Sequence, residues 1–185
     1  MSKWNNIRVG NLEARIFDIS CIGNISYWLS FDPDDLFFTS SILPYPCTTY
    51  AFNRYYNSHV KKGAHEFVSV YSINDGQYIG HFEIKNIVSS SNSGTLSHVI
   101  LGDRRYRGVG YGKEFVKLMA KVGFEYLNLY RLGLSVHVCN PIATAAYIRG
   151  GFVFEGVIRD AVQRDKKRFS LYQMSLLRHE WNSAE

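Results

Sequence analysis

The sequence predicts an α/β (α+β) fold: a mixed central sheet of about seven strands, antiparallel toward the N-terminus, with one splayed parallel pair and flanking helices. Alternating apolar runs at residues 67–73 and 78–88 flank Asn74-Asp75-Gly76-Gln77, a strong hairpin signal. Apolar residues recur at helical spacing between residues 111 and 126. This helix separates short apolar runs at residues 97–101 and 132–138. Because strands joined through a helix run parallel, the last two runs should form a parallel pair.

The composition is typical of one globular domain covering residues 1–185. The chain is 46% hydrophobic and 20% charged. No apolar run approaches the roughly 20 residues that span a bilayer, and the polar start does not resemble a signal peptide. We therefore expect a cytoplasmic protein with no membrane partner. Three cysteines without close spacing argue against a disulfide framework or a metal site.

The N-terminal third should contain one strand and two helices. Partial alternation within residues 7–19 predicts the first strand. Residues 24–29 read as a short helix, followed by a turn-rich segment that holds three of the four prolines. A second helix is predicted at residues 48–60, with Thr48 or Thr49 as its cap.

The remaining elements follow the central hairpin. A polar turn at residues 89–94 leads into the strand that ends at residue 101, so three consecutive antiparallel strands are expected. A short helix is predicted at residues 141–149. Residues 152–158 and 169–177 should form a final hairpin around a charged turn.

The junction between the strand at residues 97–101 and the central helix is unusually rich in glycine and arginine. Gly108, Gly110 and Gly112 occupy the approach and first turn, and no Ser, Thr, Asp or Asn stands there as a cap. Glycine costs roughly 1 kcal/mol relative to alanine inside a helix. Because a helix N-terminus offers unpaired N–H groups and positive charge, we expect this backbone to contact an anion, assisted by Arg105 and Arg107.

The glycine spacing excludes two common phosphate loops. A Walker loop needs Gly-Lys-Ser/Thr after four intervening residues, but Lys113 is followed by Glu114. A dinucleotide fingerprint needs Gly-x-Gly-x-x-Gly directly after the strand. Residues 107–112 instead fit Q/R-x-x-G-x-G/A and resemble the acetyl-CoA pyrophosphate loop of the GNAT superfamily of N-acetyltransferases. The pattern also matches residues 105–110; the later frame is preferred because it places Gly112 in the first helical turn.

A second signature, N-x-x-A-x-x-x-Y-x-x-x-G-F, begins at Asn140 and is similar to the same superfamily. The resemblance implies that Asn140 contacts the pantetheine arm and that Tyr147 protonates the departing thiolate. Asn140 could equally be a helix cap, and Tyr147 a core residue. Gly150 replaces the more usual leucine, which should add flexibility. The closing segment, residues 151–181, resembles the RimJ/RimL-like branch.

The resemblance implies an acetyl-CoA-dependent enzyme that acetylates a primary amine by direct attack in a ternary complex. The amine could belong to a protein N-terminus or to a small molecule, and a homodimer is possible. Glu83 and His98 are the candidate bases, and Tyr147 is the candidate acid. Amides near the splayed strand ends should polarise the thioester. The predicted cofactor-binding residues are Val99, Ile100, Leu101, Arg105, Arg107, Gly108, Val109, Gly110, Tyr111, Gly112 and Asn140.

Two other functions remain open at this point. One is a CoA-binding sensor without catalysis. The other is a nucleic-acid-binding domain that uses Lys166, Lys167, Arg168 and the loop arginines, although the anionic cofactor explains the net charge of +5 more economically. The acidic residues Asp32, Asp34, Asp35 and Glu83 would suit a cationic acceptor.

Overall fold

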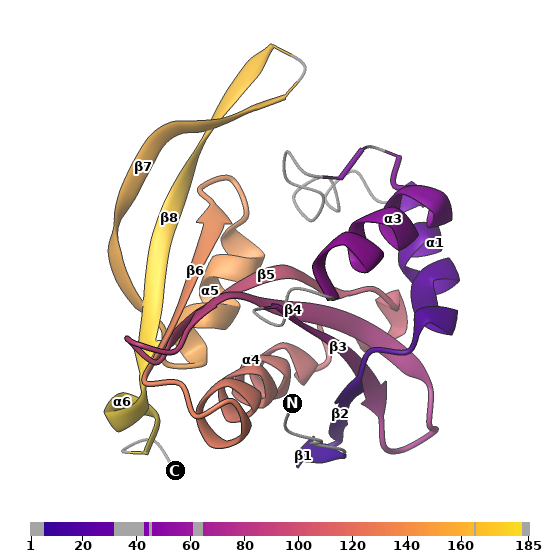
Figure 1. Ribbon diagram of the computed structural model, residues 1–185, viewed down its shortest axis with the longest axis horizontal. Coiled ribbons are helices and arrows are strands. Elements are labelled where there is room, and N and C mark those ends of the chain that lie inside the picture. The colour runs from indigo at the N-terminus through magenta and orange to yellow at the C-terminus, as the bar shows by residue number, and fades with distance from the viewer. Residues whose placement is uncertain (1–5, 32–42, 45, 61–64, 165, 183–185) are drawn as a thin grey trace.

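The computed structural model describes residues 6–31, 43–44, 46–60, 65–164 and 166–182. In this part of the chain a single eight-stranded sheet has the order β1-β2-β3-β4-β5-β6-β8-β7 (Figure 1). Its strands are β1 (Ile7–Val9), β2 (Leu12–Ile16), β3 (His65–Ser72), β4 (Tyr78–Val88), β5 (Ser93–Leu101), β6 (Arg131–His137), β7 (Val153–Arg164) and β8 (Lys167–Leu177). The helices are α1 (Ile22–Phe31), α3 (Thr49–Val60), α4 (Tyr111–Lys121), α5 (Pro141–Arg149) and α6 (Arg178–Asn182), with 3-10 turns η1 (Ile19–Cys21) and η3 (Arg104–Tyr106) and a π-helical turn η4 (Val122–Tyr126).

The mixed sheet with one parallel pair confirms the predicted fold class, with one local difference. The single strand expected within residues 7–19 is a hairpin, β1–β2, that turns at Gly10 with φ +52°. Glu114 of α4 accepts a hydrogen bond from the Asn11 amide at 3.1 Å, and its carboxyl group lies 2.6 Å from where a Cβ on Gly10 would be. This contact with α4 fixes a turn that alternation alone does not reveal.

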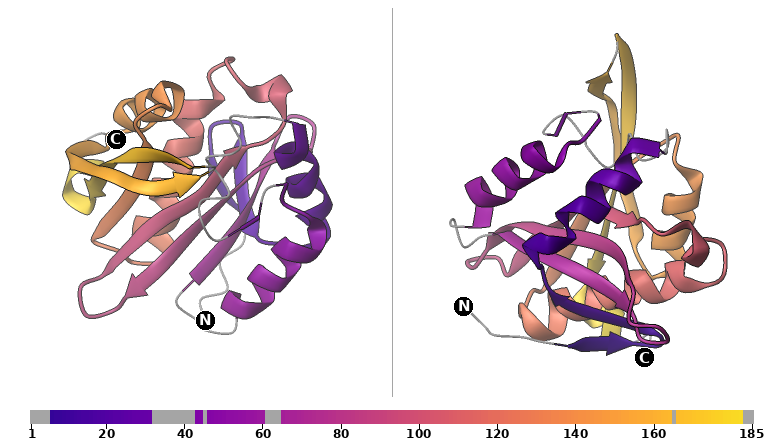
Figure 2. Two further views of the ribbon diagram at one scale, coloured as in Figure 1. Left: turned by 90° about the horizontal axis from the view of Figure 1, so that it is seen from above. Right: turned by 90° about the vertical axis from the view of Figure 1, so that its right-hand side faces the viewer.

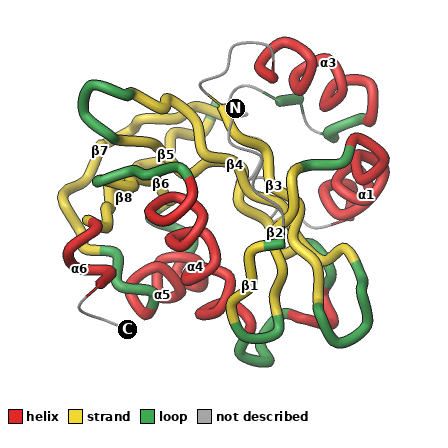
Figure 3. Tube along the Cα trace, turned by 60° about the horizontal axis from the view of Figure 1, so that its bottom comes forward, coloured by secondary structure: helices red, strands yellow, loops and turns green. Residues whose placement is uncertain are grey.

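Helices cover both faces of the sheet (Figures 2 and 3). On one face α4 packs Phe115, Leu118 and Met119 into the main core. On the other face α1 and α3 form a second core with β3 and β5, which includes Phe52 and Phe67. The amide of Ala51 donates to the Thr48 hydroxyl at 3.2 Å, so the predicted cap of α3 is confirmed.

The parallel pair β5–β6 is joined over only part of its length. Residues 93–96 of β5 pair with residues 131–134 of β6. In the rest of β5, Ser97, Ile100 and Leu101 pair with β4, and residues 97–101 have no partner on β6. A bulge in β5 lies at this point, where His98 has φ +45°. Every residue of β5 and β6 is described, and the pairing between them stops before their C-terminal ends. The predicted splay of these two strands is therefore confirmed.

Gly150 makes a close helix contact, and the flexibility expected at this position stays a prediction. A Cβ built on Gly150 would lie 2.1 Å from Cγ1 of Val116, a buried residue of α4. Valine is stiff at χ1 and cannot swing away. The small residue therefore allows α5 to approach α4.

We expect Gly150→Ala to lower the free energy of unfolding by about 1 to 3 kcal/mol, because it overpacks this contact. The matched control is Gly23→Ala in α1, where a Cβ would meet no described atom within 4 Å. That variant should raise stability by up to about 1 kcal/mol through helix propensity. Urea unfolding measures both values, and equal stabilities for wild type and Gly150→Ala would contradict the contact.

Candidate active site

The corner between β5 and α4 presents a helix N-terminus without a side-chain cap. Gly110 is the N-cap residue with φ +100°, and it provides no side-chain hydrogen bond to the first-turn amides. Gly108 also has a positive φ, of +76°. No other described atom lies within 4 Å of the Cβ positions of Gly108 or Gly110. The backbone here is therefore open to a ligand and adopts conformations that favour glycine.

The loop arginines have partners in the protein. The Nε group of Arg107 donates to the Leu101 carbonyl at 2.7 Å, which braces the end of β5. Arg105 forms an ion pair with Asp103 at 2.7 Å, while its own side chain stays largely exposed. Arg107 thus shapes the corner, and Arg105 lies at its surface with a partly compensated charge.

Two tyrosines, Tyr106 of η3 and Tyr111 at the start of α4, anchor this corner on the β3–β4 turn. The Tyr106 hydroxyl donates to the Asp75 carboxylate, which lowers the pKa of Asp75. The Asn74 side-chain amide donates to the Tyr111 hydroxyl at 3.3 Å, and the rings of Tyr106 and Tyr111 meet edge to face. Tyr111 therefore has a structural contact, whereas Val109 is mostly exposed.

These features fit the diphosphate of a coenzyme. An uncapped helix N-terminus supplies N–H donors and a partial positive charge, and glycines let an anion approach the backbone. Gly112 lies in the first turn of α4, and a Cβ there would only touch Ala146 at 3.9 Å. The later motif frame thus agrees with the position of the helix start.

Asn140 is the N-cap of α5. Its Oδ1 atom accepts a hydrogen bond from the Ala143 amide at 3.1 Å, and Pro141 follows in the first helical turn. The structural alternative for Asn140 is therefore observed. A contact with pantetheine stays a prediction, compatible with this cap because the side-chain NH₂ group is not needed for it.

Tyr147 lies on α5, buried in the main core, with its ring 5.7 Å from that of Phe152. Burial raises the pKa of its phenol well above the ordinary value. The side chain is therefore a neutral hydrogen-bond donor throughout the physiological range.

Glu83 lies on the other face of the sheet, beneath α3, and is fully buried. Its Oε2 atom accepts hydrogen bonds from Tyr55 Oη at 2.7 Å, His65 Nε2 at 2.7 Å and His98 Nδ1 at 2.8 Å. Its Oε1 atom lies 3.2 Å from His81 Nε2. We call these five residues the Glu83 cluster. The structure thus joins both candidate bases and adds three residues that the sequence reasoning missed.

The hydrogen bonds fix the protonation pattern of the cluster. Burial alone would raise the pKa of Glu83, but the charge of His98 and the imidazole hydrogen bonds outweigh it and hold this pKa well below its usual range. An ionised carboxylate only accepts, so each imidazole nitrogen that faces it carries a proton. Whenever His98 is in its neutral form, its basic lone pair is therefore on Nε2. Burial lowers the pKa of His81, which favours its neutral form.

The candidate residues form two groups on opposite faces of the sheet. Tyr147 and the glycine loop belong to the α4–α5 face, while Glu83 and His98 belong to the α1–α3 face. The bulge turns both Ser97 and His98 toward Glu83, because Ser97 is its cross-strand partner and His98 bonds to it. The end of β5, where β6 no longer pairs, lies between the groups.

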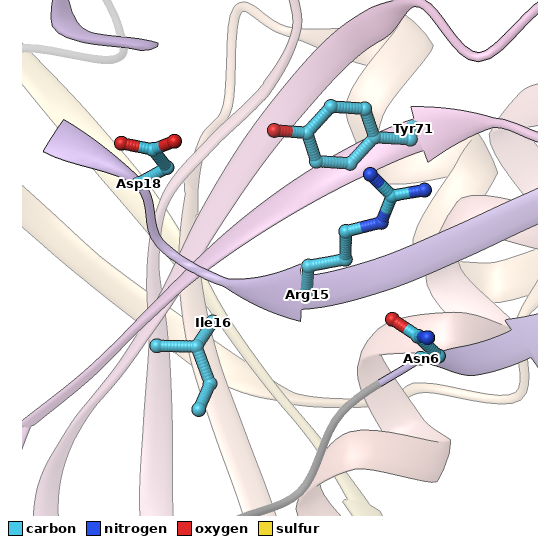
Figure 4. A pocket seen from close by; sticks show the side chains of 5 residues that line it. All are labelled: Asn6, Arg15, Ile16, Asp18 and Tyr71. Atoms are coloured by element: carbon cyan, nitrogen blue, oxygen red, sulfur yellow. The ribbon is translucent and has the colours of Figure 1, made fainter. Parts of the chain in front are cut away.

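An open cavity near the C-terminal end of β2 shares no lining residue with either group. It has a volume of about 450 Å³ and is lined by Asn6, Arg15, Ile16, Asp18 and Tyr71 (Figure 4). The Arg15 guanidinium lies 4.1 Å above the Tyr71 ring. None of the residues predicted from the sequence to bind cofactor or catalyse lines this cavity.

Within the described ranges, no group of His, Cys, Asp and Glu side chains has a geometry that could hold a metal ion. This includes the Glu83 cluster, whose imidazoles all point at the carboxylate. The helices of the same ranges are too short or too polar to cross a membrane.

A splayed parallel pair, an uncapped helix N-terminus beside it and a buried cluster of ionisable side chains are features expected of an enzyme that binds an anionic cofactor. The chain belongs to the acetyltransferase (GNAT) family, whose sequence profile matches residues 31–152. It is therefore an N-acetyltransferase, and acetyl-CoA is its co-substrate.

Solved structures of known acetyltransferases share the fold of this chain. Spermidine N-acetyltransferase from Vibrio cholerae, in complex with CoA and spermine, has a TM-score of 0.80 at 20% identity, covering 93% of this chain and 98% of that chain. A dodecameric structure of spermidine N-acetyltransferase from the same organism, in an intermediate state, has a TM-score of 0.76 at 22% identity, covering 95% and 99%. At these identities the similarity concerns the fold.

Proposed function

We propose that this enzyme acetylates the primary amine of a small cationic acceptor of the polyamine class, by direct attack while both substrates are bound. The observation that carries the proposal is the pairing of an open, uncapped α4 N-terminus with the buried Glu83 cluster across the splayed strands. The first feature holds the acyl donor, and the second receives a proton.

The donor is held by main-chain groups. Acetyl-CoA, when bound, supplies a thioester whose acetyl group moves to the amine and whose sulfur leaves as a thiolate. Amides of residues 108–112 hold the diphosphate. Amides among Val99, Ile100 and Leu101, on the side that β6 leaves unpaired, orient the thioester carbonyl and stabilise developing oxyanion charge. Asn140 contacts the pantetheine arm.

His98 is the base in this proposal, and Glu83 orients it. Glu83 fixes the proton of His98 on Nδ1, which leaves Nε2 to accept a proton, as in other carboxylate–histidine pairs. The His98 side chain is only 1% exposed. The amine proton therefore reaches it through a water molecule and not by direct contact.

Tyr147 donates a proton to the leaving sulfur. Its raised pKa keeps the phenol protonated until negative charge develops within hydrogen-bond reach. The exposed Cys139 that follows β6 has no histidine bonded to it among the described contacts, which favours direct attack over an acyl-cysteine intermediate.

Two observations support a cationic small-molecule acceptor. The structural neighbours are spermidine N-acetyltransferases, and one was solved with spermine bound. The Glu83 cluster also places a buried negative charge on the face covered by α1 and α3. Asp32, Asp34 and Asp35, predicted as further contributors, lie outside the described residues. A protein N-terminus is the second acceptor class, and it rests on the RimJ/RimL-like closing segment alone.

An acceptor panel followed by free-thiol release tests the proposal. We expect polyamines to give a kcat/KM at least about tenfold above that of N-terminal peptides, aminoglycosides or amino sugars, a difference of about 1.4 kcal/mol in transition-state binding. A fully N-acetylated polyamine is the matched control and should give no thiol. Preferred turnover of an N-terminal peptide would assign the enzyme to the RimJ/RimL-like branch.

We also propose that the protein acts in the cytoplasm and self-associates. The β7–β8 hairpin projects from the body of the molecule (Figures 1 and 2). Along β7 the apolar residues Val153, Phe154, Val157 and Ile158 are 44–51% exposed. Edge strands with such residues pair readily with another copy, and one structural neighbour is described as dodecameric.

A further inference from the structure

Tyr55 of α3 reaches the base cluster from a distant part of the chain. We propose that Tyr55 is a positioning residue, which fixes the Glu83–His98 pair and links the helix that covers this face to the base. The proposal rests on the proposed role of His98 and adds a residue whose part in the reaction the sequence motifs do not indicate.

The contacts of Tyr55 are directed at the reacting pair. The Tyr55 hydroxyl donates to Glu83 Oε2 at 2.7 Å. The hydroxyl oxygen of Tyr55 also lies 3.3 Å from His98 Nδ1. The side chain is buried beneath α3. Burial first, and then the negative charge of Glu83, raise the pKa of the phenol, so the hydroxyl remains a donor.

The ring and the hydroxyl of Tyr55 have separable roles. The ring packs edge to face on Phe52 and Phe67, contacts that phenylalanine would keep. The hydroxyl shares Glu83 Oε2 with His65 and His98. Three donors on one oxygen compete for its charge, so the Tyr55 hydroxyl reduces the charge available to stabilise protonated His98.

The direction of the pH effect follows from this competition. The titratable groups that interact with Glu83 from the packed elements are His65 of β3, His81 and Lys85 of β4, His98 of β5 and Tyr55 of α3. His59 of α3 packs on the rings of Tyr55 and His65. Tyr55→Phe removes one donor and leaves the other groups in place. Glu83 then stabilises the His98 imidazolium more strongly. Because the base must be neutral to act, the acidic limb of the rate profile should move to higher pH.

The test compares Tyr55→Phe with Tyr56→Phe. For each variant, kcat and the KM values for acetyl-CoA and acceptor are measured between about pH 5 and 9. The acceptor is spermidine or, if spermidine is inactive, the best acceptor of the panel. Tyr56 is next on α3 and packs on Phe17 and Phe67. For Tyr55→Phe we expect kcat to fall about 3- to 30-fold, the acidic limb to rise by roughly 0.5 to 1 pH unit and KM for acetyl-CoA to stay within about twofold. Tyr56→Phe should match wild type.

A His98→Asn variant tests the role of His98 as the base separately from the positioning role of Tyr55. It should lower kcat by about 10²-fold or more and abolish the acidic limb. If His98→Asn is impaired in this way but Tyr55→Phe keeps the wild-type limb and kcat, the positioning role is wrong and the base assignment stands. If His98→Asn retains wild-type kcat and limb, the base assignment itself is wrong. A thermal melt of each variant confirms that the protein measured is folded.

Discussion

Replacing Tyr147 with phenylalanine should lower kcat by about 10² to 10⁴-fold, the usual contribution of a general acid. The ring contact with Phe152 remains in this variant, so the fold should be preserved. The phenol is lost, and the developing thiolate then has no donor from α5. Steady-state kinetics with thiol detection, together with calorimetric titration of CoA, separate turnover from binding.

Affinity for CoA should remain within about threefold of wild type in this variant, because the diphosphate is held elsewhere. Tyr126→Phe is the control, since Tyr126 is partly exposed at the end of the π-helical turn η4. It should behave as wild type. Near-normal kcat in Tyr147→Phe would leave Tyr147 as a core residue only.

Glu83→Gln should damage both activity and stability. The carboxylate accepts hydrogen bonds from four side chains, and an amide would turn an NH₂ group toward some of these donors. We expect kcat to fall by about 10²-fold or more, because His98 loses its orienting charge. At neutral pH the free energy of unfolding should fall by about 3 to 5 kcal/mol, as for other broken buried charge networks.

The stability difference should depend on pH in a defined direction. The pKa of Glu83 is lowered on folding, so its contribution is fully present above its unfolded value near 4.5 and is lost as the pH falls through the folded pKa. The gap between wild type and Glu83→Gln should therefore be largest above about pH 4.5 and narrow in acid. Denaturant unfolding at several pH values measures it. If the difference in free energy of unfolding between wild type and Glu83→Gln is absent, or increases at acidic pH, the hydrogen-bond network around Glu83 is contradicted.

Glu66→Gln provides the matched control for this experiment. Glu66 lies on the neighbouring strand β3, next to His65, and burial raises its pKa. Its charged form is thus disfavoured by folding, and the neutral amide should be tolerated. We expect kcat close to wild type and no loss of stability at neutral pH.

Local patterns predicted much of this fold correctly. The Asn74–Gln77 turn and its alternating flanks define β3 and β4, and the crossover through α4 requires the parallel pair. The β1–β2 turn was missed because its geometry depends on Glu114, about a hundred residues away. The strands β7 and β8 also extend through the predicted charged turn, with Arg164 paired to Lys167.

The site was also predicted only in part, because some of its features are local in the sequence and others depend on distant residues. A glycine loop before a helix is a local signal, and the structure shows Gly110 as the uncapped N-terminus. The partners of Glu83 come from four elements, and only the strand register brings them together. His81 and Glu83 are two residues apart on one strand, so their side chains share a face of the sheet. The β3–β4 register places Phe67 opposite Glu83, and His65, two residues before Phe67, lies on that same face. Tyr55 on α3 had no such signal.

The central claim is that main-chain amides at the start of α4 bind the diphosphate of CoA. Amide chemical shifts of Gly108, Gly110 and Gly112 test it most directly, measured by two-dimensional NMR while CoA is added. The account predicts large shifts of these three resonances with CoA and none with pantetheine, which lacks the diphosphate. Binding of CoA that leaves them unmoved, while resonances around Arg15 and Tyr71 shift, would place the cofactor elsewhere and contradict the account.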